Sequence, residues 1–185
     1  MADVKIDSLA SAKEAANKLH SLGVPNVIIT TLKVPVNDVP NEILLPNATD
    51  ESLYCLSSQM DQESDVSQQH LIAFPTYRGY FSGTGDMFSA LVVARWQEEL
   101  KKSTPSLAAA TKLVVLSVNS VTKGTWEKQV KHIKKITNGE REFIDGRPET
   151  PALVRCCEIQ MVKSRQAIEE PELVGNNESI KMTKL

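Results

Sequence analysis

The sequence has few cysteines, little excess of charge of either sign and no long apolar run, and each absence excludes a class of protein. Three cysteines are too few for a disulfide framework, and their usage fits a reducing compartment. Acidic and basic side chains number 23 and 21, so nucleic acid is not expected to bind by bulk electrostatics. No apolar stretch approaches the roughly 20 residues of a membrane span, and the N-terminus lacks the apolar segment of a secretory signal. We therefore expect a cytoplasmic protein whose partners are neither nucleic acid nor membrane.

Length and composition predict one globular domain. A chain of 185 residues, 41% of them apolar, can bury a core without a metal or a disulfide. We expect residues 1–185 to form a single domain.

The first part of the chain predicts a helix followed by strands. Apolar residues recur at helical spacing over 8–22, and Gly23 can end that helix in the left-handed conformation. The β-branched run 24–34 is typical of a strand buried on both faces, so that a parallel sheet is favoured. After a loop, residues 53–60 and 70–77 predict a hairpin, in which Pro75 either ends the second strand or places it on an edge.

The second part of the chain predicts mostly helices. Apolar residues after the glycines near position 83 indicate a largely buried helix that runs to 102. The later elements are expected as a long helix over 106–137, a loop over 138–151, a strand over 153–162, a short helix over 163–174 that stops before Pro171, and a frayed, polar stretch of the last ten residues.

The segment Gly83-Thr84-Gly85-Asp86 stands where an extended stretch meets the buried helix. Two glycines allow unusual backbone angles and the close approach of a ligand. The unpaired N–H groups and the dipole of the helix start then suit a phosphate. Asp86 has two readings: it caps the helix, or it accepts the proton of an attacking hydroxyl beside the transferring phosphoryl group.

Three blocks of sequence carry a family resemblance. FSGTGDMFSALVVA closely resembles the anion-hole motif of ribokinase-like kinases, and with its flank, GYFSGTGDMFSALVVA, it resembles pyridoxal kinase. LHSLGVPNVIITTLKV and EIQMVKSRQAIEEPELV resemble two further segments of that family, in the family's order, and the three lie within residues 5–174. The resemblance implies an α/β fold, a ribokinase-like three-layer sandwich.

The resemblance implies roles for individual residues. Asp86 would be the catalytic base for the 5′-hydroxymethyl group of pyridoxal, with Gly83, Thr84 and Gly85 as the anion hole. The remaining matches concern the site of ATP: the hydroxyl pair Thr30 and Thr31 near its phosphates, Phe81 beside the nucleotide, and Val118 and Val121 as walls for the adenine. Strand propensity also explains the threonines, and core packing also explains the two valines.

The same resemblance implies substrates, ions and partners. ATP would phosphorylate pyridoxal, pyridoxine or pyridoxamine, with Mg²⁺ or another divalent ion and with K⁺ as a further ion. A homodimer is implied as well. His20, His70 and His132 lack partners at ligand spacing, so no metal site is expected within this chain.

The chain resembles only the C-terminal half of the family. The first strands of the central sheet, most of the pyridoxal pocket, the lid and the acidic residues near the metal belong to the half that has no counterpart here. We therefore expect strand 24–32 to be a bare apolar edge that invites pairing with another chain, and little or no activity of this chain alone.

Two alternatives stay open at this point. One is another ribokinase-like kinase, for example one acting on a hydroxymethylpyrimidine, against which the block EIQMVKSRQAIEEPELV argues. The other is a non-catalytic, kinase-derived module that pairs through its exposed edge.

Overall fold

A computed structural model describes residues 2–61, 64, 66–174 and 179–185, and the chain divides into two compact units. The first unit comprises Met1–Pro75, Ala94–Lys112 and Asn177–Leu185. The second comprises Thr76–Val93 and Leu113–Asn176. Each unit is described by itself below, and the single domain stays a prediction.

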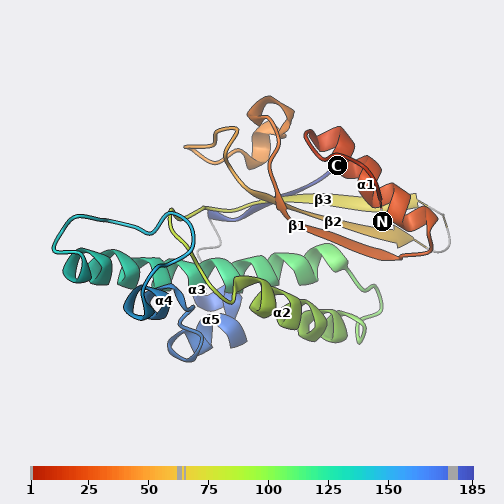
Figure 1. The fold of residues 1–185 in the computed structure, drawn as a ribbon. Coiled ribbons are helices and arrows are strands. Elements are labelled where there is room, and N and C mark those ends of the chain that lie inside the picture. Colours follow the sequence, from red (N-terminus) through yellow and green to blue (C-terminus); the bar gives the residue numbers. More distant parts are fainter. Residues whose placement is uncertain (1, 62–63, 65, 175–178) are drawn as a thin grey trace. The chain divides into compact units, whose positions relative to one another are not determined.

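The first unit is built on a four-stranded sheet with the helix α1 (Leu9–Ser21) on one face (Figure 1). Ala12 and Ala16 of α1 pack in one core cluster with Val27 and Leu56 of the sheet. The strands, in their order across the sheet, are β1 (Asn26–Leu32), β2 (Tyr54–Asp61), β3 (Val66–Ala73) and β4 (Lys181–Lys184).

Helix α1 forms as its sequence predicts. The Ser8 hydroxyl accepts a hydrogen bond from the Ser11 amide, and the Ser11 hydroxyl accepts one from the Ser8 amide, so the two serines make a capping box. Gly23 has a φ of 88°, the left-handed conformation expected where the helix ends.

The prediction of a parallel sheet is wrong, because all neighbouring strands run antiparallel. The chain returns from β1 to β2 through a segment that contains the 3₁₀ turns η1 (Val36–Asp38) and η2 (Asn41–Ile43), with no crossover helix. Without such a crossover, consecutive strands pair antiparallel. The predicted β2–β3 hairpin is confirmed, although its second strand begins at Val66 rather than at residue 70.

Strand β1 lies at the edge of the sheet and, within the described part of the chain, pairs only with β2. The predicted edge is thus confirmed, whereas burial on both faces is wrong: only Val27 and Leu32 of β1 are buried. Between Ile29 and Leu32 the pairing with β2 shifts register, so the strand carries an irregularity there.

The expectation of a frayed C-terminus is wrong for the residues that the structure describes. Strand β4 pairs with β3 from His70 opposite Lys184 to Ala73 opposite Lys181, and the Leu185 amide donates to the Gln69 carbonyl at 2.9 Å. Main-chain hydrogen bonds can hold a strand in a sheet whatever its side chains are. The polar composition of this segment therefore did not indicate whether it pairs. Residues 176–178 of the predicted frayed stretch lie outside the described residues.

The second unit is helical. Helix α2 (Thr84–Glu99) and the long helix α3 (Leu107–Ile136) each continue from one unit into the other, and α3 confirms the helix predicted over 106–137. The remaining elements are α4 (Pro151–Cys157), η3 (Val162–Ser164), α5 (Arg165–Glu169) and α6 (Pro171–Val174), which confirm the helical character of 163–174 and its interruption before Pro171.

The strand predicted over 153–162 is wrong, because its first half is helix α4. Thr150 caps the helix by accepting a hydrogen bond from the Leu153 amide, and Pro151 occupies its first turn. A capping threonine followed by proline is a helix-start signal that outweighs the short apolar run after it.

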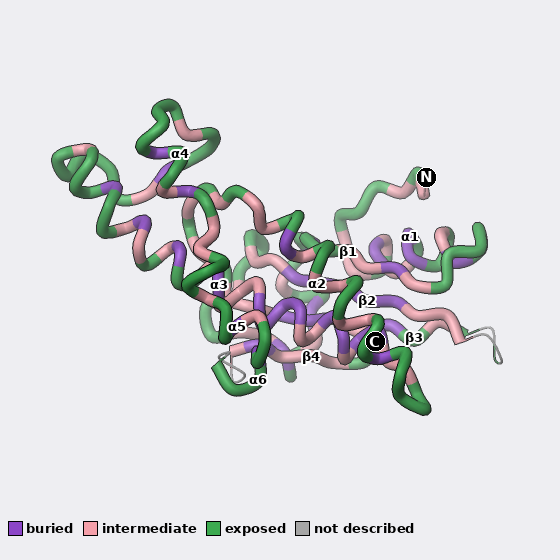
Figure 2. The backbone as a smooth tube through the Cα atoms, turned by 90° about the horizontal axis from the view of Figure 1, so that it is seen from below, coloured by how far each residue is buried: buried purple, intermediate pink, exposed green. Residues whose placement is uncertain are grey.

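The prediction that the helix after the glycines is largely buried is also wrong. Met87 and Glu99 are the buried residues among those of α2, and Val93 is 64% exposed. An apolar pattern shows which face of a helix can be buried, but it does not show that other residues of the chain pack against that face. In Figure 2, burial is instead concentrated in strands such as β2 and β3 and along one side of α3.

No helix among the described residues is long and apolar enough to cross a membrane.

Candidate active site

The glycine turn, residues Gly83–Asp86, forms the start of helix α2. Gly83 precedes the helix with a φ of 94°, and its carbonyl accepts the Met87 amide at 3.0 Å as the first helical hydrogen bond. The amides of Thr84, Gly85 and Asp86 therefore stand in the first turn, where a helix provides no acceptor. Three such amides at the positive end of the helix dipole are suited to an anion.

A short parallel bridge fixes the entrance to the glycine turn. The Ser82 amide donates to the Cys157 carbonyl at 2.8 Å, and the Ile159 amide donates to the Ser82 carbonyl at 3.2 Å. A Cβ atom on Gly83 would lie 3.3 Å from Cγ1 of Ile159, tighter than an ordinary contact. Glycine is thus required at position 83 both by its positive φ and by the packing of Ile159.

Helix α3 supports both sides of this bridge. The Gln129 side-chain amide donates to the Tyr80 carbonyl at 2.8 Å, and the Thr125 hydroxyl accepts the Gln160 amide at 3.1 Å. Gln129 is 1% exposed, and a Cβ on Gly79 would lie 2.9 Å from its Oε1. The backbone before the glycine turn is therefore held at fixed points along one helix.

Aromatic side chains pack beside the same backbone. The rings of Tyr77 and Trp126 lie 5.6 Å apart between centroids, and the Tyr77 hydroxyl donates to Oδ1 of Asn119 at 3.3 Å. Burial, and then the charge of Glu127, raise the pKa of the Tyr77 hydroxyl, so it remains a neutral donor at physiological pH. Phe81 is half-buried.

Asp86 is the third residue of α2, and it is exposed. Within the described residues, none forms a hydrogen bond or an ion pair with its carboxylate that would mark it as a structural cap. The carboxylate can accept a proton, and it stands in the same helical turn as the three amides. The described chain does not bury it, so water reaches it.

The structure brings some predicted site residues together and leaves others in different units. Phe81 and the glycine turn are continuous in the second unit, which also contains Val118 and Val121 of α3. Val121 is fully buried, in keeping with the core reading, whereas Val118 is half-buried. Thr30 and Thr31 belong to the first unit, where both are exposed at the irregularity of β1.

Sequence reasoning missed the residues that hold the turn in place. Thr125 and Gln129 fall within a regular helical pattern that does not distinguish them, and Ile159 falls within the stretch predicted as a strand. The resemblance of EIQMVKSRQAIEEPELV to a kinase segment was the signal that could have found Ile159. A segment shared with a kinase family can contribute to the site, and not only to a strand or helix.

The described residues contain no group of three or more histidine, cysteine, aspartate or glutamate side chains placed to hold a metal ion. His20 is buried instead in a polar contact, with Nδ1 at 2.7 Å from the Val24 carbonyl and Nε2 at 2.7 Å from the Ser58 hydroxyl. The histidine thus has a structural role, and the carboxylate that lies within the glycine turn is that of Asp86.

Comparison with known sequences finds pyridoxal kinases, while no protein-family model matches the chain. The sheep pyridoxal kinase is 30% identical over 173 residues, which cover 92% of this chain and 47% of that protein. The pyridoxal kinase of Dictyostelium discoideum is 24% identical over 177 residues, with 96% and 49% covered. The chain spans about half the length of these curated relatives, and the match lies in their C-terminal part.

Solved structures give the same result for the fold. Pyridoxal kinase from Leishmania donovani in complex with ADP and pyridoxine superposes with a TM-score of 0.64 at 22% identity, over 100% of this chain and 46% of that one. Pyridoxal kinase from Trypanosoma brucei gives 0.61 at 20% identity, over 100% and 47%. The α/β fold expected from the resemblance is therefore the ribokinase-like fold of these enzymes, over about half of their length.

Proposed function

We propose, since this chain corresponds to the C-terminal part of a pyridoxal kinase, that it carries the phosphate-binding turn and the catalytic base of an ATP-dependent kinase. The acceptor is the 5′-hydroxymethyl group of pyridoxal, and also of pyridoxine and pyridoxamine. The observation that carries this proposal is the glycine turn itself, in which one carboxylate and three main-chain amides share the first turn of α2.

Asp86 acts as the general base in this proposal. The 5′ oxygen attacks the γ-phosphorus of ATP as the bond from that phosphorus to the β,γ-bridging oxygen breaks, and ADP leaves. The proton of the hydroxyl passes to the Asp86 carboxylate. A carboxylate that has no hydrogen-bond or ion-pair partner among the described residues is suited to this role, because taking the proton breaks no ion pair within them.

The amides of Thr84, Gly85 and Asp86 stabilise the phosphoryl group during transfer. Their N–H groups are held in place before the substrate arrives, because Gly83 is fixed by the Ser82 bridge and by Ile159. Donors that need no reorganisation contribute most to stabilising charge in a transition state.

The other proposed contacts are to ATP. Thr30 and Thr31 meet its phosphates with their exposed hydroxyls, and Phe81 and Val118 line the nucleotide, for which their partial exposure leaves surface available. Val121 is the weakest of these assignments, since it is already fully buried in the protein. Mg²⁺ would come with the nucleotide, and no step here is routed through it or through K⁺.

The chain alone has little or no activity in this proposal. Asp86 and the threonines are open to water, whereas phosphoryl transfer depends on orientation and on the exclusion of water. The alternative function is that of a non-catalytic, kinase-derived module. Such a module differs from the proposed kinase part because it has no preformed nucleotide site.

Thermal shifts of the full chain with ATP and Mg²⁺ test the proposal. ATP should raise the melting temperature, because a ligand that binds only the folded state stabilises it. Thr84→Pro should reduce that shift more than Thr84→Val does, since proline is tolerated at the first helical position but removes the amide donor. Absence of any shift with ATP would favour the non-catalytic module.

The base is tested by formation of pyridoxal 5′-phosphate. Any residual product should be lost in Asp86→Asn and retained in Glu140→Gln, a matched change of an exposed carboxylate in the second unit. Efficient turnover by the chain alone would refute the expected inactivity, and turnover that survives Asp86→Asn would refute the assignment of the base.

A further inference from the structure

Thr125 is a fully buried residue of helix α3, and its hydroxyl makes two hydrogen bonds. It donates to the Val121 carbonyl at 2.8 Å, within the helix, and it accepts the Gln160 amide at 3.1 Å. A hydroxyl has one proton to donate and two lone pairs that accept. Because the Val121 carbonyl takes the proton, the lone pairs are left for the Gln160 amide, and the main chain at Gln160 is held to α3.

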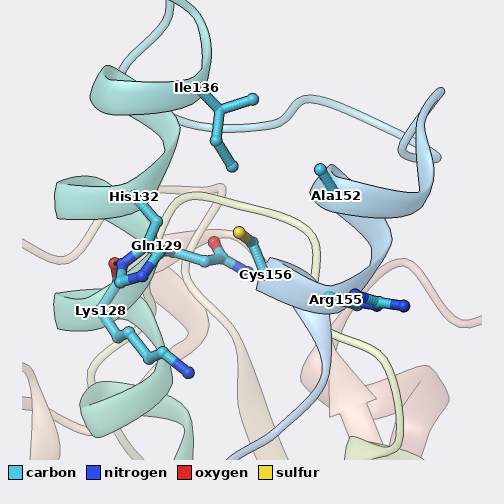
Figure 3. Close-up of a pocket in the computed structure, with 7 residues that line it drawn as sticks. All are labelled: Lys128, Gln129, His132, Ile136, Ala152, Arg155 and Cys156. Carbon is cyan, nitrogen blue, oxygen red and sulfur yellow. Dashed lines mark hydrogen bonds between the residues drawn. The ribbon is translucent and has the colours of Figure 1, made fainter.

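The Gln160 side chain is held to the same helix. The Lys128 ammonium donates to Oε1 of Gln160 at 2.9 Å, and Nε2 of Gln160 donates to the Glu158 carbonyl at 3.1 Å. Figure 3 shows Lys128 and the neighbouring Gln129 on α3, with Gln129 reaching toward the last turn of α4, which leads into this segment. Residues 158–160 are therefore tied to α3 through both their main chain and a side chain.

The residue before Gln160 contacts the entrance of the glycine turn. The Ile159 amide donates to the Ser82 carbonyl at 3.2 Å, and a Cβ on Gly83 would lie 3.3 Å from Cγ1 of Ile159. A main chain held at Gln160 therefore holds Ile159, which limits where Gly83 can lie. The three amides of residues 84–86 follow directly, so their direction depends on that position.

We propose that Thr125 is a positioning residue for the phosphate at the glycine turn, an inference that rests on the proposed function. Thr125 acts through Gln160 and Ile159 rather than by a contact with the phosphate. Donors that are already in place bind an anion more tightly than donors that must first be ordered, and they stabilise developing charge better. Without the Thr125 hydroxyl, α2 still begins at the same residue, but its first amides are ordered only when the phosphate arrives.

Thr111 allows this role to be separated from the stability of the helix. It is also fully buried in α3, and its hydroxyl donates to the Leu107 carbonyl at 2.7 Å. That hydroxyl makes no further hydrogen bond to another described residue, and Thr111 belongs to the first unit. Valine removes the same intrahelical bond at either position and keeps the branched shape of the side chain. A difference between Thr125→Val and Thr111→Val therefore reports the contact with Gln160.

Hydrogen–deuterium exchange of the full chain tests the positioning without a ligand. In Thr125→Val, the amides of Ser82 and Ile159 should exchange about fivefold faster than in the unaltered chain, because the segment that they bridge has lost one hydrogen bond. Thr125→Ser keeps the hydroxyl and should keep the original rates, as should Thr111→Val. Unchanged protection in Thr125→Val, or equal acceleration in Thr111→Val, would overturn the proposal.

A second variant decides the question should Thr125→Val not fold. Lys128→Met removes the side-chain tie to Gln160 without altering a fully buried residue. The matched control is Lys131→Met, at an exposed lysine of the same helix. The Ile159 amide should exchange faster in Lys128→Met than in Lys131→Met, and equal rates would overturn the proposal.

The affinity for ATP in the presence of Mg²⁺ relates the position of the turn to its use. The dissociation constant of ATP, obtained from thermal shifts of the full chain, should rise about fivefold in Thr125→Val and return to its original value in Thr125→Ser. Equal affinity in Thr125→Val and in the unaltered chain would overturn this inference and leave the proposed function standing. If the unaltered chain binds no ATP, the proposed function fails, and the exchange rates still decide whether Thr125 positions the turn.

Discussion

The Ser82 amide lies 2.8 Å from the Cys157 carbonyl oxygen, so two segments far apart in the sequence are hydrogen-bonded where the glycine turn begins. The Ile159 amide completes the pair by donating to Ser82. The turn that presents the proposed anion site therefore depends on a C-terminal segment that follows helix α4. This dependence leads to the first two predictions.

Substitution of Gly83 by valine should destabilise the second unit. A β-branched residue is strained at a φ of 94°, and its Cβ would lie 3.3 Å from the Ile159 side chain. We expect a loss of about 2–3 kcal/mol, measured by chemical denaturation. Gly85→Ala is the control, because a Cβ at this helical position would have no atom within 4 Å. Alanine there should be neutral or slightly stabilising, and an equal loss at both glycines would contradict the argument.

Gly79 and Gln129 should be energetically coupled. A Cβ on Gly79 would lie 2.9 Å from Gln129 Oε1, so Gly79→Ala forces one of the two to move. Its cost, about 1–3 kcal/mol, should be smaller in a Gln129→Ala background, where the clash is absent but the strain of the positive φ remains. A double-mutant cycle by denaturation measures the coupling, and additive losses would mean that the contact does not matter.

The stability of the chain should fall as pH rises above about 9 because of Cys55. Burial raises the pKa of the Cys55 thiol from 9.0 to about 12. Between these values the unfolded chain loses a proton that the folded chain retains, so deprotonation favours unfolding by up to about 1.4 kcal/mol per pH unit. Denaturation at pH 8 and at pH 10 should show this loss in the unaltered chain.

Variants isolate the contribution of this thiol. Cys55→Ala should lower stability at both pH values but weaken its dependence on pH, because the buried thiol with the raised pKa is removed. The explanation fails if Cys55→Ala keeps the full slope.

Strand β1 should make the chain prone to self-association. It is an edge strand whose sequence, NVIITTL, contains none of the charges or prolines that protect such edges. Ile28→Lys should lower the fraction of large species in light scattering at equal concentration, because a charge on an edge opposes strand pairing. Val93→Lys is the control, being an exposed valine of helix α2 that lies outside the sheet. Equal effects of the two lysines would contradict the role of the edge.

The sequence by itself was sufficient for features that depend on neighbouring residues. The capping box of Ser8 and Ser11, the left-handed Gly23 and the long helix α3 all follow from local chemistry and periodicity. The motif around Asp86 predicted a helix start with free amides for the same reason, since the few residues around a helix start determine its first turn.

Only the tertiary structure decided which segments meet. Antiparallel pairing of β1 with β2, and of the polar β4 with β3, depends on the path of the chain between the strands, which no local pattern contains. The hydrogen bonds from Ser82 to Cys157 and from Gln129 to Tyr80 are likewise accepted by main-chain carbonyl oxygens. Because every residue has such an oxygen, the sequence does not show which residue accepts the bond. Side-chain patterns determine elements and caps, whereas hydrogen bonds to the main chain of distant segments become visible only once the chain is folded.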